Sequence, residues 1–338
     1  MLRSRKNAAY IIAEVGQNHQ GDLNLAKKYV RQFADAGADA IKFQKRDMAT
    51  LFEPLALSKE YNSENAFGET YGEHREALEL SIEEMAELKE ECSKFDVDFM
   101  CTAFDRVSLH QLKDIGTQVI KMASFDMGNV PFLQEVIESD IPFVISAGGA
   151  NADIVDATVE YLIGNNAKFS LLHCVSRYPC RAEELTLGRI TLLKEKYPSV
   201  QVGLSDHFNG ILSGAVGYQL GAEVFEKHVT FDRSWRGTDH SFALTLHGFE
   251  NFVRDINRTQ QMLRHELPEG VGTEAVFKKL GKKIVAATDI KSGEYFDVKN
   301  LSCRINGEGV PVRDSVRLIG KLAKRDYKSG EYIDVSEI

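Results

Sequence analysis

Eight short apolar segments, rich in β-branched residues, recur through the first 230 residues of the chain, and most gaps between them carry an amphipathic helical pattern. Strands that are buried on both faces and alternate with helices predict a parallel sheet. Eight such units in about 250 residues predict a closed (β/α)₈ TIM barrel, with a doubly wound open sheet as the competing topology. The eight segments are Tyr10–Val15, Ala40–Gln44, Asp98–Phe104, Val119–Ser124, Phe143–Gly148, Phe169–Val175, Val200–Asp206 and Val224–Thr230.

Two helical segments carry clear end signals. Leu23–Ala36 follows Asp22, a favourable N-cap residue, and Ser81–Phe95 opens with the Ser-x-x-Glu spacing of a capping box. The gap at 45–80 is too long for a simple connection. It is either an excursion that covers a site at the rim of the barrel or an ordinary surface loop, and the two interpretations have equal weight.

The end of the chain has a different organisation. A Pro- and Gly-containing stretch, Pro268–Thr273, reads as part of a linker at 267–282, which divides a barrel domain at 1–266 from a small domain at 283–338. In the small domain Asp289–Val298 recurs as Asp326–Val335. Each copy predicts a short strand, a Lys-Ser-Gly turn and another short strand, so we expect one pseudo-symmetric β-rich unit.

Composition narrows the classes of function. The net charge of −9 argues against nucleic acid as a partner, and no apolar segment is long enough to span a membrane. The basic start of the chain is not followed by the apolar segment of a secretory signal. The five cysteines are odd in number and lack paired spacing, which predicts reduced thiols in the cytoplasm: Cys92, Cys101, Cys174, Cys180 and Cys303.

The stretch Val200–Thr230 predicts a strand–helix–strand unit whose two strands end in His207 and His228. Imidazoles at the ends of neighbouring parallel strands can face one bound metal ion, although either histidine alone is more simply a polar loop residue. Two imidazoles leave positions open for water and substrate oxygens. That suits a six-coordinate ion such as Mn²⁺ or Mg²⁺ better than a closed tetrahedral zinc site.

The other strands also end in polar residues, and in a barrel these ends surround the site. Two lysines and several hydroxyls inside an acidic barrel suggest an anion cradle for phosphate or carboxylate. The competing interpretation pairs the lysines with barrel carboxylates such as Glu14 and Glu226. Glu14 is itself either a general base or a salt-bridge partner. The strand-end residues are Glu14, Lys42, Gln44, Thr102, Lys121, Ser124, Ser146, Ser176, Tyr178, Ser205, His207, Glu226 and His228, with Asp239 in the loop that follows.

Several motifs together resemble the sialic acid (N-acetylneuraminate) synthase family, and the end of the chain is similar to the antifreeze-like, or SAF, domain that follows the barrel in these enzymes. The resemblance spans nearly the whole barrel in the family order. The motifs are Ala13-Glu-Val-Gly-Gln-Asn-His-Gln-Gly21, Ile41-Lys-Phe-Gln44, Ile120-Lys-Met-Ala-Ser124, Leu172-His-Cys-Val-Ser-Arg-Tyr-Pro179, Gly203-Leu-Ser-Asp-His207, Glu226-Lys-His228 and Gly237-Thr-Asp-His240.

The resemblance implies a synthase that joins phosphoenolpyruvate to an open-chain N-acetylated amino sugar and releases phosphate by C–O cleavage. It implies a divalent metal on His207 and His228, usually Mn²⁺, with Mg²⁺ or Co²⁺ as the alternatives, and a water activated by Glu14. It also implies a domain-swapped dimer in which the small domain lends Arg304 to the partner's site. The implied phosphoenolpyruvate contacts are Lys42, Thr102, Lys121, Ser124, Ser146, Ser176 and Ser205, and the implied sugar contacts are Gln44, Tyr178, Asp239 and Arg304.

Some positions depart from the family pattern. Ser146-Ala-Gly-Gly stands where Ser-Thr-Gly-Met is usual, and Thr238 replaces a proline before Asp239. The sugar is therefore open among N-acetylmannosamine, its 6-phosphate and 2,4-diacetamido analogues. Two other functions compete with the synthase: a metal-dependent barrel aldolase that does not use phosphoenolpyruvate, and a non-catalytic sugar-binding relative.

Overall fold

The structure, a computed structural model, describes residues 2–305 and 307–338. It comprises two compact units, of which the first ends at Leu263 and the second runs from Arg264 to Ile338. The segment 267–282, where the sequence suggested a linker, contains the short helix α12 (Ala275–Leu280) and belongs to the second unit. No helix in the described part of the chain combines the length and the hydropathy that crossing a bilayer requires.

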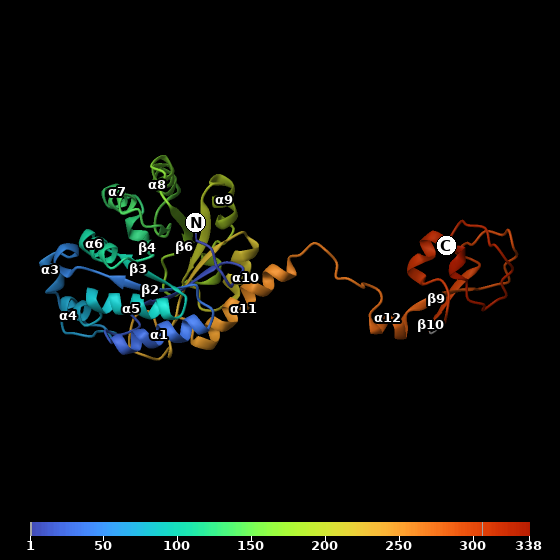
Figure 1. Cartoon of the computed structure of the whole chain (residues 1–338), viewed down its shortest axis with the longest axis horizontal. Helices are drawn as coiled ribbons and strands as arrows, with labels where there is room; N and C mark the ends of the chain where they lie inside the picture. Colours follow the sequence, from blue (N-terminus) through green and yellow to red (C-terminus); the bar gives the residue numbers. More distant parts are fainter. Residues whose placement is uncertain (1, 306) are drawn as a thin grey trace. The chain divides into compact units, whose positions relative to one another are not determined.

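The first unit is a closed barrel of eight parallel strands that pair in chain order, with β1 completing the ring against β8 (Figure 1). This confirms the (β/α)₈ prediction and excludes the open sheet. Each predicted segment corresponds to one strand, and β1 and β2 each extend one residue beyond theirs. The strands are β1 (Tyr10–Gly16), β2 (Ala40–Lys45), β3 (Asp98–Ala103), β4 (Val119–Met122), β5 (Phe143–Ser146), β6 (Phe169–Cys174), β7 (Gln201–Asp206) and β8 (Val224–His228).

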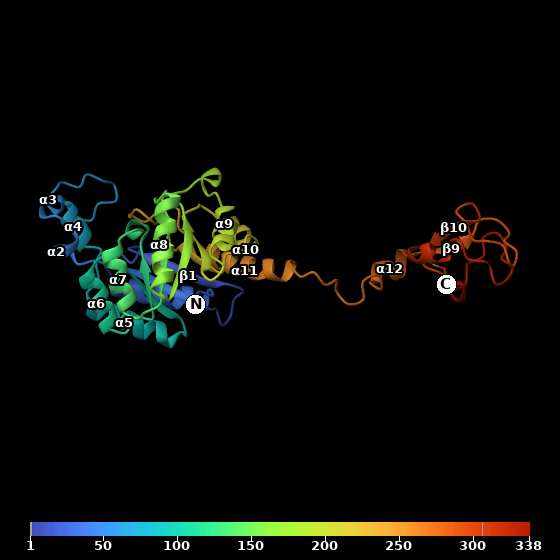
Figure 2. The same ribbon diagram turned by 90° about the horizontal axis from the view of Figure 1, so that it is seen from above.

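Helices surround the strands and bury their apolar faces against the outside of the barrel (Figures 1 and 2). Asp22 caps α1 by accepting hydrogen bonds from the backbone N–H groups of Asn24 and Leu25, and the capping box of Ser81 and Glu84 opens α5, as predicted. The surrounding helices are α1 (Leu23–Asp35), α5 (Ile82–Lys94), α6 (Arg106–Asp114), α7 (Val130–Glu138), α8 (Ala152–Gly164), α9 (Arg189–Lys196), α10 (Leu212–Gln219) and α11 (Leu246–Met262).

Some strands end earlier than their apolar segments suggested. The segment Val119–Ser124 was expected to be extended throughout, but β4 ends at Met122, and Ser124–Asp126 forms a 3₁₀ turn. The turn is stabilised by a hydrogen bond from the backbone N–H of Asp126 to the carbonyl of Ala123 at 3.0 Å. Ser124 therefore sits on a turn beyond the strand, and it still faces the barrel mouth.

The excursion at 45–80 contains three short helices, α2 (Met48–Leu51), α3 (Pro54–Leu57) and α4 (Tyr71–Glu76). They gather at one edge of the barrel (Figure 2). A capping box between Thr70 and Glu73 opens α4, and an isolated bridge joins Glu60 to Thr70. The excursion thus has a defined conformation, which positions the side chains that it directs at the barrel mouth.

The second unit is small and β-rich. Strands β9 (Lys282–Ala286) and β10 (Leu301–Ile305) form an antiparallel pair, and α13 (Ser315–Leu318) follows. Its core is a cluster of apolar side chains separate from that of the barrel. The buried members are Ile284, Ala286, Ile290, Phe296, Val310, Leu318, Ala323, Tyr327 and Ile333.

The two repeat copies pair with each other. Ile290 forms an antiparallel bridge with Tyr327, and the carboxylates of Asp289 and Asp326 each bind the Lys-Ser turn of the other copy. The prediction of a complete strand–turn–strand in each copy was wrong in detail, because the residues flanking each turn form isolated bridges. The expected pseudo-symmetry is present.

Candidate active site

A layer of polar side chains faces the barrel interior at the C-terminal ends of the strands. Ile12 and Ala40 point into the barrel. Because alternate residues of a strand share a face, Glu14 and Lys42, each two residues further along its strand, also point inward. The strand register places Glu14 between Lys42 and His228. An apolar layer closes the barrel beneath these groups: Tyr10, Ile12, Ala40, Met100, Val119, Val144, Leu172 and Val224.

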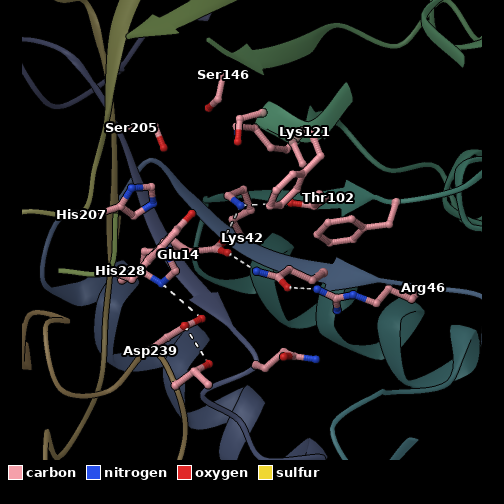
Figure 3. Close-up of a pocket in the computed structure, with 18 of the residues that line it drawn as sticks. Glu14, Lys42, Arg46, Thr102, Lys121, Ser146, Ser205, His207, His228 and Asp239 are labelled. Atoms are coloured by element: carbon pink, nitrogen blue, oxygen red, sulfur yellow. Dashed lines mark hydrogen bonds and ion pairs between the residues drawn. The ribbon is translucent and has the colours of Figure 1, made fainter. Parts of the chain in front are cut away.

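This polar layer forms the floor of a cavity of about 810 Å³ (Figure 3). Twelve of the fourteen residues that the family resemblance implied for the site line it, and so does Glu226, although they come from all parts of the barrel sequence. The twelve are Glu14, Lys42, Gln44, Thr102, Lys121, Ser124, Ser146, Tyr178, Ser205, His207, His228 and Asp239.

Four buried charges lie at the centre of the floor. The Nζ atom of Lys42 lies 2.7 Å from Oε2 of Glu14 and 3.7 Å from Oε2 of Glu226, and Nζ of Lys121 lies 3.6 Å from the same Glu226 oxygen. The lysines thus do pair with barrel carboxylates, as the competing interpretation held. The four charges sum to zero, so a bound phosphate would need further positive charge or a proton.

Burial and charge shift the pKa values of both glutamates, in opposite directions. Burial and the nearby Glu226 raise the pKa of Glu14, although the Lys42 ammonium opposes the shift. Burial would also raise the pKa of Glu226, but the ammonium groups of Lys121 and Lys42 outweigh it and lower that pKa to about 2. Two carboxylates with separated pKa values suit a proton-transfer role for Glu14 and a fixed negative charge on Glu226.

Several buried polar atoms of the floor lack hydrogen-bond partners within the part of the chain that is described. They are Oγ of Ser146, Oε2 of Glu226 and Nδ1 of His228. Unpaired buried polar atoms are costly and rare in folded proteins. Their concentration in one cavity indicates a site whose remaining hydrogen bonds come from a ligand.

The two imidazoles lie side by side, with ring centroids 5.4 Å apart. Nδ1 of His207 lies 2.9 Å from the carbonyl oxygen of Val175, and since a carbonyl only accepts, Nε2 of His207 carries a free lone pair. Burial lowers the pKa of both rings, to about 4 for His207, so both are neutral near pH 7. Nδ1 of His228 also lies 3.8 Å from Oδ2 of Asp239.

Neutral imidazoles are good metal ligands, and the pair satisfies that requirement. Within residues 2–305 and 307–338, no group of three or more histidine, cysteine, aspartate or glutamate side chains is arranged to hold a metal ion. Any metal here would therefore take two protein ligands, His207 and His228, and keep most of its coordination positions for water and substrate. The unpaired Nδ1 of His228 is consistent with that arrangement.

Ser176 lies beside this cavity and is not among the residues that line it. Its Oγ is 3.1 Å from Oγ of Ser124, and it lines a neighbouring cavity of about 410 Å³. A Cβ on Gly148 would lie 2.4 Å from Oγ of Ser176 and 2.8 Å from Sγ of Cys174. The second glycine of the Ser-Ala-Gly-Gly stretch, Gly149, has open space around it.

Arg304 lies on β10 of the second unit, where it is exposed and donates to the carbonyl of Gly330 at 3.4 Å. Its implied role at a partner's site stays a prediction.

The cavity also contains residues that the sequence did not single out. Six of them belong to the excursion at 45–80, which therefore does cover the site. Its length was the available signal, but the sequence does not say which of its side chains turn toward the barrel. The additional residues include Gln17, Arg46, Leu51, Phe52, Asn65, Tyr71, Arg75, Phe104, Asp126 and Thr238.

The fold and the site define a (β/α)₈-barrel protein with paired lysines, glutamates and imidazoles at the catalytic face. Residues 29–267 match the model of the NeuB family. The human N-acetylneuraminate-9-phosphate synthase is 32% identical over 94% of this chain and 89% of its own length. The N,N'-diacetyllegionaminic acid synthase of Campylobacter jejuni is also 32% identical, over 94% and 96%.

A solved structure agrees with the sequence relatives. The N-acetylneuraminic acid (sialic acid) synthetase of Leptospira borgpetersenii superposes with a TM-score of 0.67 at 35% identity, covering 80% of this chain and 90% of that one. The chain belongs to the NeuB family.

Proposed function

We propose that this protein is a nonulosonic (sialic) acid synthase. It condenses phosphoenolpyruvate with an open-chain N-acetylated amino sugar and releases phosphate by C–O cleavage. The observation that carries the proposal is the single cavity in which Lys42, Lys121 and the unpaired hydroxyl of Ser146 lie beside Glu14 and two neutral imidazoles. The synthases among its relatives make it the function that this chemistry supports best.

Phosphoenolpyruvate would occupy the lysine side of the cavity. Its phosphate and carboxylate would accept hydrogen bonds from the ammonium groups of Lys42 and Lys121 and from nearby hydroxyls. Two of these hydroxyls lie directly beside the buried charges of the floor. Oγ of Ser205 donates to Glu226 at 3.1 Å, and Oγ1 of Thr102 lies 3.1 Å from Nζ of Lys42. Ser124, Ser146 and Ser176 complete the proposed set.

Glu14 would be the general base. Its Oε1 accepts a hydrogen bond from Nε2 of Gln44 at 2.7 Å, which fixes the carboxylate while its raised pKa lets it take up a proton. C3 of phosphoenolpyruvate would form a bond to the aldehyde carbon of the sugar, and the aldehyde oxygen would take up a proton to become a hydroxyl. A water deprotonated by Glu14 would add at C2. The C2–O bond to phosphate then breaks, the electron pair leaves with the phosphate, and the new C2 hydroxyl loses its proton to give the ketone.

His207 and His228 would hold a divalent metal, with Mn²⁺ the best candidate. When bound, the metal supplies Lewis-acid polarisation of the sugar aldehyde and positive charge that the balanced floor lacks. Tyr178 packs against His207 with ring centroids 4.1 Å apart, and Phe242 against His228 at 5.1 Å, so aromatic rings keep both imidazoles in place. Asp239, beside His228, would bind sugar hydroxyls together with Gln44 and Tyr178.

The second unit would act as a SAF domain. In a domain-swapped dimer its Arg304 would reach the sugar site of the partner chain. The five cysteines, Cys92, Cys101, Cys174, Cys180 and Cys303, are all free thiols, which agrees with the expected cytoplasmic location.

The test is a product assay. The protein is incubated with Mn²⁺, phosphoenolpyruvate and, in separate reactions, N-acetylmannosamine, its 6-phosphate and 2,4-diacetamido sugars. The proposal predicts equal amounts of phosphate and a 2-keto acid with at least one sugar. An aldolase or a sugar-binding relative would yield no phosphate with any of them, and that result would refute the proposal.

The metal has its own test. His207→Ala should remove high-affinity Mn²⁺ binding, measured by titration calorimetry, and abolish phosphate release while the protein stays folded. Full activity of chelator-stripped wild type would exclude a metal from the mechanism.

A further inference from the structure

Three arginine side chains line the cavity or a small pocket beside it. Arg46 and Arg75, from the excursion at 45–80, line the cavity itself. Arg236 comes from the loop after β8, and it shares with Gln17, Thr238 and Asp239 a small adjoining pocket. The two segments meet where the backbone N–H of Gly237 donates to Oδ1 of Asn65 at 3.0 Å. Figure 3 shows Asp239 on the opposite side of the cavity from Ser146 and Lys121.

The arginines outnumber the carboxylates that pair with them. Arg46 pairs with Glu79 at 3.0 Å. Arg75 makes only neutral contacts in the part of the chain that is described, to Oε1 of Gln17 and the hydroxyl of Tyr71, each at 2.9 Å. The guanidinium of Arg236 lies over the ring of Phe67, 4.2 Å from its centroid, without an ion-pair partner among the described residues. The nearby carboxylate of Asp239 pairs, among the described residues, only with the neutral His228, so the guanidinium groups of Arg75 and Arg236 exceed it by one positive charge.

The charges act on a common region. The rings that lie under Arg75 and Arg236, those of Tyr71 and Phe67, both flank His74, with ring centroids 6.2 and 6.1 Å from its own. In agreement, burial and then the charges of both arginines lower the pKa of His74. Aromatic rings orient them, since Arg75 also lies over Tyr71, with 4.9 Å to the ring centroid. Stacked guanidinium groups keep their N–H edges available for a planar pair of hydrogen bonds.

Gln17 adds an unmet donor at the same place. Its Oε1 accepts from Arg75, but its Nε2 is buried and has no partner among the residues described. Gln17 lines both the main cavity and the pocket beside Arg236. A buried amide donor and unpaired arginines together call for an acceptor with several oxygens and negative charge, which a sugar hydroxyl does not provide.

We propose that Arg75, Arg236 and Gln17 form a binding site for a phosphate monoester at the far end of the amino sugar, on carbon 6. This inference rests on the proposed synthase function and names its substrate class as a phosphorylated hexosamine. Asp239, Arg236 and Gln17 line the same small pocket, so a sugar whose hydroxyls bind Asp239 lies next to these groups.

The test compares kcat/KM for N-acetylmannosamine and N-acetylmannosamine 6-phosphate at saturating phosphoenolpyruvate. We expect the wild type to prefer the phosphorylated sugar by at least about 100-fold, because each of two charge-assisted contacts contributes on the order of tenfold or more. Arg75→Gln and Arg236→Gln should each reduce that preference by about tenfold, mainly through KM, and Arg75→Lys by less. Arg254→Gln, the same change on the exposed face of α11, is the matched control and should leave the preference unaltered.

The outcomes separate this inference from the proposed function. Phosphate release with the unphosphorylated or diacetamido sugar at equal or higher kcat/KM would overturn the inference and leave the synthase function standing. Absence of phosphate release with every sugar would overturn both. If the two glutamine variants reduced kcat/KM equally for both sugars, the arginines would only support the loops, and the inference would fall.

Discussion

The strands of this barrel carry buried ion pairs on both faces, and the two faces differ in how completely their polar atoms are paired. On the outer face of β7 and β8, Asp206 pairs with Lys227 at 2.6 Å. On the inner face of the same strands, Glu226 lies no closer than 3.6 Å to a lysine nitrogen. All these side chains are almost fully buried.

The outer pair is complete. The carboxylate of Asp206 also accepts from the hydroxyl of Ser213 and, at 2.9 Å, from the backbone N–H of Phe208, and Lys227 donates to the carbonyl of Phe208. Because Asp206 precedes His207 and Lys227 precedes His228, this network ties together the strand ends that carry the two imidazoles. Its role is to position them.

The inner set is incomplete. Oε2 of Glu226, Oγ of Ser146 and Nδ1 of His228 are buried without hydrogen-bond partners in the described residues. A folded chain tolerates such a deficit where a ligand completes it. The difference teaches that burial alone does not separate a structural ion pair from a binding site, whereas the completeness of hydrogen bonding does.

The largest effect on the rate should come from the inner face. Glu14→Gln removes the proposed base, so we expect turnover with phosphoenolpyruvate to fall by about 10²- to 10⁴-fold. The free energy of unfolding should fall only modestly, because Lys42 keeps Glu226 at 3.7 Å and a buried carboxylate with a raised pKa is replaced by a neutral amide. Phosphate-release kinetics and urea denaturation measure the two effects. A large loss of stability with normal turnover would place Glu14 with the structural pairs.

The largest effect on stability should come from the outer face. Lys227→Met leaves the buried Asp206 carboxylate unpaired, and breaking such a pair costs about 3–5 kcal/mol. Lys42→Met should reduce the free energy of unfolding by less, because Glu14, whose pKa is raised, can take up a proton and so avoid an unpaired buried charge. Urea denaturation followed by the fluorescence of Trp235, the one tryptophan of the chain, reports on the barrel. Equal losses in the two variants would remove the distinction between the faces.

The pH dependence of stability gives a smaller, signed effect. The pKa of Glu226 is lowered to about 2 from its ordinary 4.5, so the unfolded chain takes up this proton first as the pH falls. Its contribution to stability is present above 4.5 and is lost toward pH 2. Glu14 has the opposite pH dependence, because its pKa is raised in the folded protein. Its contribution to stability is fully present below pH 4.5 and is lost as the pH rises through the raised pKa. Glu226→Gln should therefore lose less stability than the wild type between pH 4.5 and 2 in acid denaturation.

The smallest effect should come from the exposed ion pairs of the second unit. Lys291 and Asp326 pair at 2.9 Å, but both side chains are mostly exposed. Exposed pairs contribute little because water screens them. Lys291→Ala should leave the thermal midpoint of the protein unchanged within error. A clear decrease would show that the reciprocal contacts of the repeat stabilise the unit more than exposure suggests.

Much of this arrangement could be predicted from the sequence, because it follows from periodicity. Eight apolar segments predict eight strands, and the period of two within each strand aligns Glu14, Lys42, Lys121 and His228 at one end of a barrel. The same periodicity did not show that Asp206 and Lys227, next to the histidines, form a completed pair on the other face. That depends on Ser213 of α10, which only the folded chain brings near.

The arginines were harder to anticipate. Arg75 and Arg236 are far apart in the sequence and lie on an excursion and a loop, where no regular period relates them. Their meeting depends on contacts such as that of Asn65 with Gly237. Arg304 was implied by family resemblance alone, and its place in a dimer remains a prediction.

The central claim is that the inner, incompletely paired face binds phosphoenolpyruvate and directs water to its C2 atom. Phosphoenolpyruvate labelled with ¹⁸O at the oxygen between C2 and phosphorus tests it directly, by mass spectrometry of both products of a reaction with Mn²⁺ and the amino sugar. The account predicts that the label leaves with the phosphate. Label retained in the organic product, with solvent oxygen in the phosphate, would mean attack at phosphorus and would contradict it.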